Sequence, residues 1–144
     1  MATQDYSNHK QLVPLFHIVL FGLLVLTLIG SVVNLYESWG DHLRIYSASL
    51  IVVLTICVLM LSFFCRVFAL KAQDRAIRAE ENLRHYVLTG KLLDSRLAIR
   101  QTIALRFASD EEFVELARRA AAEQLAPDAI KQAIRSWRAD LYRA

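Results

Sequence analysis

Two long runs without charged residues dominate the pattern of hydrophobic and polar positions along the chain. The first extends from Gln11 to Tyr36 and the second from Ile45 to Cys65. As helices they would measure about 39 Å and about 31 Å, which is enough to cross a hydrocarbon core of roughly 30 Å. We therefore predict two membrane spans joined by an external loop at 37–44.

The first run is not expected to be a cleaved signal peptide. Its only preceding basic residue is Lys10, it exceeds the usual apolar length, and it offers no clear small-residue cleavage site before Glu37. Both runs are therefore interpreted as spans that remain in the protein.

The remaining residues divide the chain into further segments. A tail at 1–10 precedes the hairpin of spans at 11–65. Because no Gly or Pro follows the second span until Gly90, the helix is expected to continue over 66–90. The segment 91–144 is predicted to form three short helices. The expected fold is an all-α membrane protein, a two-span hairpin whose second helix extends into the cytoplasm and is followed by these three helices.

Start signals and apolar periodicity define the three short helices. The first is expected to open at Asp94 or Ser95, the second at Ser109 through a capping box with Glu112, and the third at Pro127. The extension before them keeps helical charge pairing, with Glu80/Arg84 as one pair. The expected buried stripes are Leu97, Ile103, Ala104 and Phe107 in the first helix; Phe113, Leu116, Ala117, Ala120 and Ala121 in the second; and Ile130, Ile134, Trp137 and Leu141 in the third.

The orientation follows from the basic residues beside the spans, which are retained on the cytoplasmic side. The loop carries only Arg44, whereas five basic residues follow Cys65, namely Arg66, Lys71, Arg75, Arg78 and Arg84. Both termini are therefore expected in the cytoplasm. Arg66, Lys71 and Arg75 are expected to contact anionic lipid headgroups.

Weakly polar residues follow one stripe on each span. One stripe contains Thr27, Gly30, Ser31 and Asn34, and the other contains Ser47, Thr55 and Ser62. In lipid, small polar residues mark close helix packing and interhelical hydrogen bonds. The spans are expected to pack on each other through these residues, with contact to another subunit as the alternative.

His17 is the one candidate ligand for a cofactor within a span, as a haem or pigment ligand or a proton relay. The second span has no His to complete a two-His haem site, and His42 lies at the opposite face. A lone His near a span end is expected to meet headgroups or a backbone carbonyl instead. No cofactor is expected, and the absence of CxxC, HExxH and His/Cys clusters predicts no metal site.

Composition agrees with membrane insertion and narrows the function. The 144 residues are 56% hydrophobic, with 17 Lys+Arg against 14 Asp+Glu, which is too apolar for an ordinary soluble domain of this size. The C-terminal segment lacks the dense basic stripe of a nucleic-acid-binding face, so no nucleic acid is expected as a partner. The sequence also contains no Gly-rich phosphate loop, nucleophile elbow or catalytic triad, so we expect no enzyme.

Three long strings carry a resemblance to a known family. They are RVFALKAQDRAIRAEENLRHYVLTGKLLD, LAIRQTIALRFASDEEF and IKQAIRSWRAD. In these strings the chain resembles a family of small bacterial membrane proteins of unknown function, from about Asn8 to Arg138. The resemblance implies a bacterial inner-membrane protein with two spans and a helical cytoplasmic tail. It implies no activity, cofactor or catalytic residue.

Two functional classes remain open. The first is a scaffold or accessory subunit that associates with copies of itself or with a larger membrane complex. The second is a small channel or transport protomer that forms a pathway only as an oligomer. The absence of intramembrane charge favours the first class. Apolar residues of the helical extension, Ile77 and Leu83 among them, are expected to mediate association.

Overall fold

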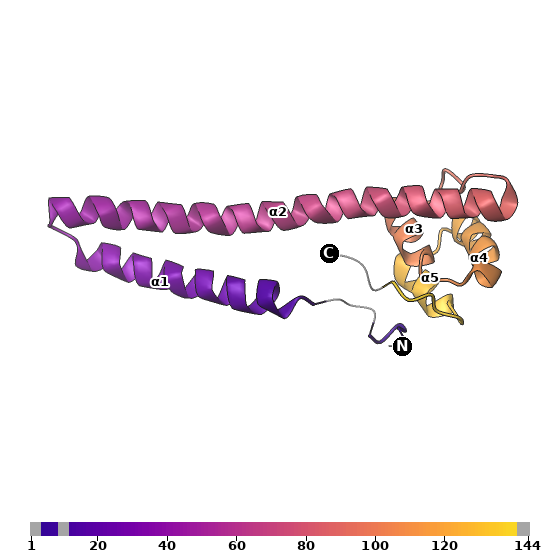
Figure 1. Ribbon diagram of the computed structural model, residues 1–144, viewed down its shortest axis with the longest axis horizontal. Coiled ribbons are helices and arrows are strands. Elements are labelled where there is room, and N and C mark those ends of the chain that lie inside the picture. Colours follow the sequence, from indigo (N-terminus) through magenta and orange to yellow (C-terminus); the bar gives the residue numbers. More distant parts are fainter. Residues whose placement is uncertain (1–3, 9–11, 141–144) are drawn as a thin grey trace. The chain divides into compact units, whose positions relative to one another are not determined.

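The computed structural model describes residues 4–8 and 12–140 and is built of helices. They form two compact units, a span unit over Gln11–Phe68 and a C-terminal unit that combines Met1–Lys10 with Ala69–Ala144. The helices are a π-helix η1 at Leu15–Leu20, α1 at Phe21–Glu37, α2 at His42–Thr89, α3 at Ile99–Leu105, α4 at Asp110–Glu123 and α5 at Pro127–Ala133 (Figure 1).

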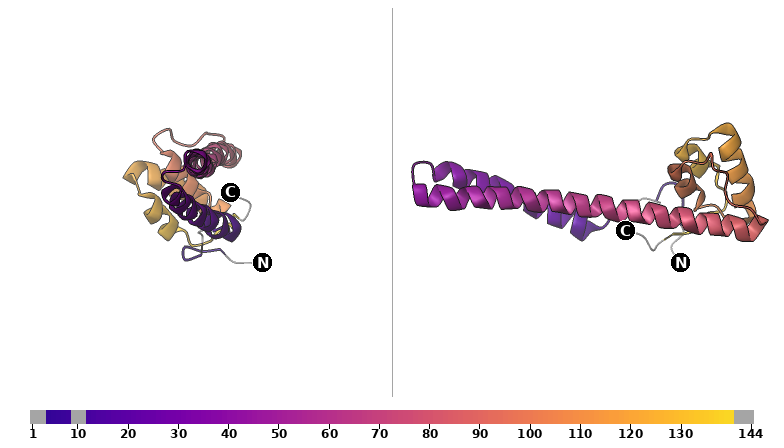
Figure 2. Two further views of the ribbon diagram at one scale, coloured as in Figure 1. Left: turned by 90° about the vertical axis from the view of Figure 1, so that its left-hand side faces the viewer. Right: turned by 90° about the horizontal axis from the view of Figure 1, so that it is seen from above.

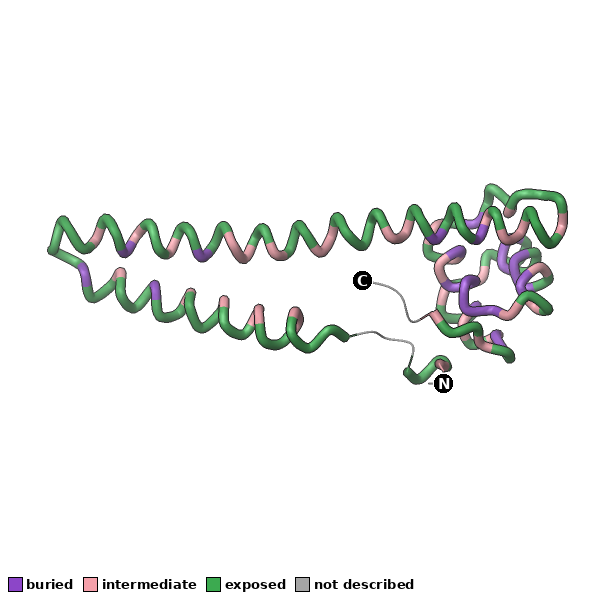
Figure 3. Tube along the Cα trace, in the orientation of Figure 1, coloured by how far each residue is buried: buried purple, intermediate pink, exposed green. Residues whose placement is uncertain are grey.

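Two of these helical segments are long and apolar enough to cross a membrane, as the hydrophobic pattern predicts. They are Leu15–Glu37 and α2. Only 6% of the apolar window in the first and 11% of that in the second is buried. A core helix of a soluble protein would be mostly covered by protein. In these helices most residues are exposed (Figure 3), large hydrophobic ones included.

A short turn joins α1 to α2, and its local chemistry explains where α2 begins. Gly40 has a positive φ of 97°, which an L side chain rarely adopts. The Asp41 carboxylate then accepts hydrogen bonds from the backbone N–H groups of Leu43 and Arg44, at 3.1 and 3.2 Å, as an N-cap residue does. Helix α2 therefore starts three residues before the expected Ile45.

Helix α2 ends where the sequence predicts. Gly90, with a φ of 73°, follows the last helical residue, and its N–H donates to the carbonyl of Tyr86 at 2.8 Å. A glycine in the left-handed region is the common termination signal of an α-helix. The helix therefore continues without interruption from the apolar run to Thr89.

The C-terminal unit has a closed hydrophobic core formed by α3, α4, α5 and the segments beside them (Figures 1 and 2). The stripe predicted for the second short helix is confirmed, since all five of its residues are buried. The buried core residues are Leu97, Ala104, Leu105, Phe107, Ala108, Phe113, Leu116, Ala117, Ala120, Ala121, Ile130 and Ile134.

The first short helix begins later than the sequence predicts. The Asp94 carboxylate accepts the backbone N–H of Arg96 at 2.9 Å, and the N–H of Leu97 donates to the Asp94 carbonyl at 3.1 Å. These bonds form a turn in place of a helical start. Helix α3 instead opens after Ala98, whose N–H donates to the Gln101 side chain at 2.7 Å.

The third short helix is shorter than predicted. Helix α5 ends at Ala133, and Ile134 is extended, so the stripe through Trp137 is not helical. Trp137 instead forms an isolated antiparallel bridge with Ala108 and is half-buried. Leu141, the last member of that predicted stripe, lies outside the described residues.

The capping box predicted at the start of α4 does not form. Ser109 occupies the N-cap position, but its side chain makes no capping hydrogen bond. The Glu112 carboxylate, however, accepts the backbone N–H groups of Arg135 and Ser136, at 3.2 and 2.9 Å. The N–H of Ser109 donates to the carbonyl of Ser136 at 3.0 Å. Glu112 therefore fixes the extended segment after α5, which explains why α5 stops.

Candidate functional site

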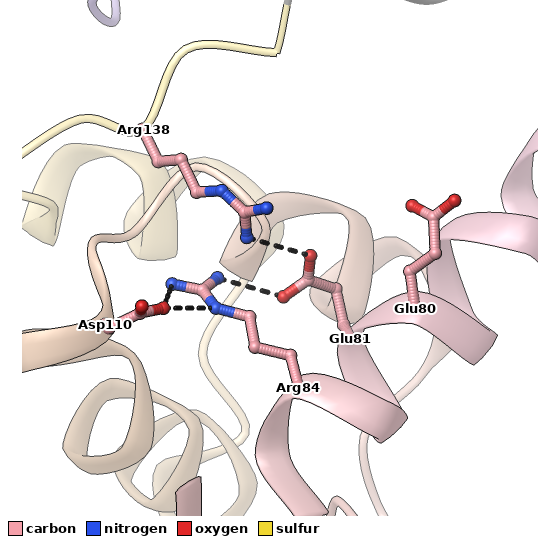
Figure 4. Close-up of a pocket in the computed structure, with 5 residues that line it drawn as sticks. All are labelled: Glu80, Glu81, Arg84, Asp110 and Arg138. Atoms are coloured by element: carbon pink, nitrogen blue, oxygen red, sulfur yellow. Dashed lines mark hydrogen bonds and ion pairs between the residues drawn. The ribbon is translucent and has the colours of Figure 1, made fainter. Parts of the chain in front are cut away.

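A charged cluster in the C-terminal unit is built around Arg84 of α2 (Figure 4). The Arg84 guanidinium contacts Glu81 on the same helix at 3.0 Å and Asp110 at the start of α4 at 2.6 Å. It also donates to the carbonyl of Ala108 at 2.7 Å. One side chain thereby connects α2 with the end of the α3 segment and the beginning of α4.

Burial makes this cluster different from a surface ion pair. The side chains of Arg84 and Glu81 are 10% and 6% exposed. The guanidinium lies over the ring of Phe113, 4.2 Å from its centroid, and Arg138 approaches the second oxygen of Glu81 at 3.9 Å. Buried charges require such pairing, because an unpaired one would lose its hydration without compensation. The charges of Arg84 and Glu81 are thus used to hold the unit together.

Glu80 lies beside the cluster without joining it. Together with the four clustered side chains it lines an open cavity of about 370 Å³. Its carboxylate points away from Arg84, and no bond connects it to the other residues drawn (Figure 4). The Glu80/Arg84 pair predicted from helical spacing is therefore not formed, since Arg84 pairs with Glu81 and Asp110 instead.

A second open cavity, of about 640 Å³, lies against α4 and the segment after α2. Its basic side chains include Arg96 and Arg118, and each has an acidic partner. Arg96 contacts Asp94 at 2.7 Å and holds the pKa of that carboxyl at about 2, while Arg118 contacts Glu115 at 2.6 Å and lowers the pKa of its carboxyl. These pairs neutralise two of the basic side chains in the lining, which also includes Lys91.

The weakly polar residues of the spans fall into two groups. Ser31 and Thr55 are buried and Ser62 is half-buried, whereas Thr27, Gly30, Asn34 and Ser47 are exposed. A side chain added at Gly30 would meet open space. Only part of each stripe predicted from the sequence is therefore covered within the span unit.

The hydroxyl groups of these residues bond within their own helices. Ser31 donates to the carbonyl of Leu28, and Thr55 donates to that of Ile51, each at 2.8 Å. Thr27, Ser47 and Ser62 donate in the same way to the carbonyls of Leu23, Arg44 and Val58. Each hydroxyl thus donates its single proton within its own helix, while its oxygen can still accept, and packing of the spans through these residues stays a prediction.

His17 meets a backbone carbonyl, which is the structural role expected for it. Its Nδ1 atom lies 2.9 Å from the carbonyl oxygen of Val13 and 3.1 Å from the backbone nitrogen of the same residue. The ring also packs edge-on against Phe16, with centroids 5.2 Å apart. Among the described residues, no group of three His, Cys, Asp or Glu side chains is placed to hold a metal ion.

The three basic residues that are predicted to contact lipid headgroups lie in different surroundings. The guanidinium of Arg66 lies 6.0 Å from the ring centroid of Phe16, within the span unit, and Arg66 is half-buried. Lys71 and Arg75 are exposed on α2. The contact with lipid stays a prediction for all three.

The two residues expected to mediate association occupy different environments. Ile77 is 6% exposed and Leu83 is 63% exposed. Ile77 is therefore covered by its own chain, which differs from the expectation that both residues lie on an open surface. Leu83 remains available for contact with another molecule.

Comparison with known proteins identifies the family. A model of the family of unknown function DUF6526 matches residues 1–144, the whole chain. The chain belongs to the DUF6526 family. This membership confirms the resemblance expected from the three sequence strings, while a bacterial inner membrane stays a prediction for the DUF6526 protein. The comparisons with curated proteins and with solved structures give no match.

Sequence reasoning missed the central role of Arg84 in the DUF6526 protein. Its partners Ala108 and Asp110 lie more than twenty residues away, so no local spacing reveals them. One local signal was present. Arg84 follows Glu81 by three residues, which is as compatible with a helical ion pair as the spacing of four to Glu80.

Proposed function

We propose that this protein is a non-enzymatic membrane scaffold or accessory subunit, with two spans and a helical unit that binds copies of itself or other membrane proteins. The observation that carries the proposal is the contrast between its two units. The span unit exposes long apolar helices, whereas the C-terminal unit has a closed core and pairs its buried charges internally. Such a molecule is suited to hold a place in a bilayer and to present helix surfaces.

We infer that the two spans form a hairpin. The contact between Phe16 and Arg66 supports this, because it joins the beginning of the first apolar segment to the end of the second. Less exposed positions also recur along the sides of the two helices that face each other in Figure 3. Residues of reduced exposure include Leu24, Leu28, Ser31 and Leu35 on α1, and Ala48, Val52, Thr55 and Ser62 on α2.

We also propose that both termini lie in the cytoplasm, in a bacterial inner membrane. The asymmetry of Lys and Arg favours this orientation. A second observation supports the placement of both ends on one side. Within the C-terminal unit, Gln132 donates to the Tyr6 hydroxyl at 3.2 Å, and the N–H of Asp140 donates to the Gln4 side chain at 2.8 Å. The two ends of the chain therefore contact each other.

Thiol labelling in intact cells tests the topology. In a variant with Cys57→Ser and Cys65→Ser, a cysteine at Trp39, which is 79% exposed in the turn, should react with an impermeant maleimide. A cysteine at the exposed Ser136 should react only after the cells are opened. The reverse pattern would overturn the proposed orientation.

One observation favours the alternative function of an oligomeric channel or transport protomer. Thr27, Gly30 and Asn34 lie at spacings of three and four on α1, and all three are exposed. Polar residues on an exposed side of a span can line a pathway when several copies assemble. Liposomes containing the purified protein should show no ion conductance above empty liposomes if the scaffold proposal holds. A defined conductance would favour the alternative.

Extraction in a gentle detergent, followed by mass measurement, tests the scaffold function itself. We expect a complex larger than one chain, either of identical copies or with specific co-purifying membrane proteins. A monomeric mass with no crosslinked neighbour in native membranes would contradict the proposal.

A further inference from the structure

The part of α2 inside the C-terminal unit has an apolar face that the described part of the chain leaves open. Its positions follow one another at spacings of three, four, three, four and three residues, and all of them are exposed. They are Ala69, Ala72, Ala76, Ala79, Leu83 and Tyr86. A 3–4 repeat sustained over 18 residues is the spacing of a two-stranded coiled coil.

The C-terminal unit covers a different side of the same helix. Ile77, Glu81 and Arg84 are buried or half-buried against it. At 100° per residue these positions lie roughly 140° around the helix from the apolar face. The cover over Ile77 therefore does not extend to Leu83 or Tyr86, which are 63% and 53% exposed.

We propose that this face pairs in parallel, and in register, with the same face of a second copy of the chain. With Ala69, Ala76 and Leu83 at the a positions, Ala72, Ala79 and Tyr86 occupy the d positions. Small side chains at four of these six positions let the two backbones approach closely at the membrane end. Leu83 and Tyr86 supply the larger apolar contact at the far end.

Charge complementarity indicates that the molecule packed on this face is a second copy of the chain. In this register Arg75 is a g residue and Glu80 is the following e residue, and these positions meet across a parallel pair. Each dimer would thus form two Arg75–Glu80 ion pairs. Among the described residues neither side chain has an ion-pair or hydrogen-bond partner, and the Glu80 carboxylate points away from the Arg84 cluster (Figure 4).

The orientation of the pair follows from the same charges. In an antiparallel pair g residues face g residues and e residues face e residues, so Arg75 would not meet Glu80. A parallel pair also agrees with the proposed function, on which this inference rests, because two copies inserted in one membrane with the same topology hold their α2 helices in the same direction. Confinement to one bilayer raises the effective concentration of the two copies, so that even a modest interface can hold them together.

Disulfide crosslinking of the full-length protein in isolated membranes tests the pairing. In the Cys57→Ser, Cys65→Ser background, Ala76→Cys and Ala79→Cys should each give a crosslinked dimer under mild oxidation, because a and d residues meet their counterparts. Arg78→Cys is the matched control, since Arg78 is exposed on another side of the helix. It should give little dimer. Equal crosslinking at Arg78 and Ala79 would overturn the inference, and so would adducts with another protein only.

A charge exchange provides a second arm. Arg75→Glu and Glu80→Arg should each reduce the crosslinked fraction at Ala79→Cys by about fivefold, because two ion pairs become two like-charge contacts. The double exchange should restore it. Failure of rescue would overturn the assigned register.

Membrane extraction separates this inference from the proposed function. If the variants resist alkaline extraction from the membrane but do not crosslink at Ala76 or Ala79, the parallel pairing is wrong and the membrane scaffold stands. If the unsubstituted protein itself is extracted as a soluble chain, the proposed function is wrong.

Discussion

Arg84 shows how one side chain can hold a small helical unit together. It is nearly buried, lies over an aromatic ring and contacts two carboxylates and a backbone carbonyl from three parts of the chain. Removing a single partner from such a buried ionic cluster lowers the folding stability by more than the intact cluster contributes to it, because the remaining charge stays buried.

We predict that Arg84→Ala destabilises the C-terminal unit by about 3 to 5 kcal/mol, because the buried Glu81 keeps only the more distant Arg138 as an ionic partner and the Ala108 carbonyl loses its donor. Urea unfolding followed by Trp137 fluorescence, in a Trp39→Phe background, measures the change. As a control, Arg118→Ala removes an exposed pair and should leave the midpoint nearly unchanged. Replacing Arg84 with Met and Glu81 with Leu together should recover much of the loss. Equal destabilisation by Arg84→Ala and Arg118→Ala would contradict this role.

A second residue-scale prediction concerns Asp94, whose pKa is held at about 2, below its ordinary 3.8, mainly by the hydrogen bond from the Arg96 side chain. The folded pKa is depressed, so the contribution of this pair to stability is present above about 3.8 and is lost as the pH falls through about 2. Arg96→Gln should raise the pKa of Asp94 toward 3.8 in an NMR titration. An unchanged value would show that Arg96 is not the cause.

At the scale of elements, the extended segment after α5 replaces a predicted helical turn. Trp137 packs on Phe107, with ring centroids 5.1 Å apart, while the N–H of Arg138 donates to the Phe107 carbonyl at 2.7 Å. The segment is thus fixed by contacts with the end of α3 and with Glu112 of α4.

We predict that Trp137→Ala costs about 2 kcal/mol of stability, less than the 3 to 5 kcal/mol expected for a fully buried ring, because one side of the indole remains in solvent. Trp137→Phe should cost less, since it preserves the ring contact with Phe107. Urea unfolding followed by circular dichroism compares the variants. If Trp137→Ala lowered the stability by as much as the truncation of a fully buried ring does, the indole would be completely buried.

The elements that sequence predicted well are those with local causes. The apolar stripe of α4, the end of α2 at Gly90 and the two long apolar helices all follow from composition and periodicity within a few turns. The features that sequence missed are distant contacts. Glu112 bonds to residues more than twenty positions away, and this decides both the cap of α4 and the end of α5. Local periodicity contains no information about such a bond.

At the scale of the whole molecule, Ile77 and Leu83 separate folding from association. We predict that Ile77→Asp unfolds the C-terminal unit, because it buries an unpaired charge. Leu83→Asp should leave the fold intact and reduce the dimer mass measured in native membranes. Circular dichroism and crosslinking of both variants distinguish the two effects. Loss of helical content in Leu83→Asp would contradict the surface role of Leu83.

The turn between α1 and α2 has its own consequence for how such a protein is controlled. Only residues 38–41 separate the two helices. In the proposed orientation, this turn would be the only connecting segment on the outer side of the bilayer. It is too short to form a folded extracellular domain, a large ligand-binding surface or an extended loop that a protease could cleave. In that orientation, most of the surface through which a signal could reach this protein would lie within the lipid or in the compartment that holds its termini.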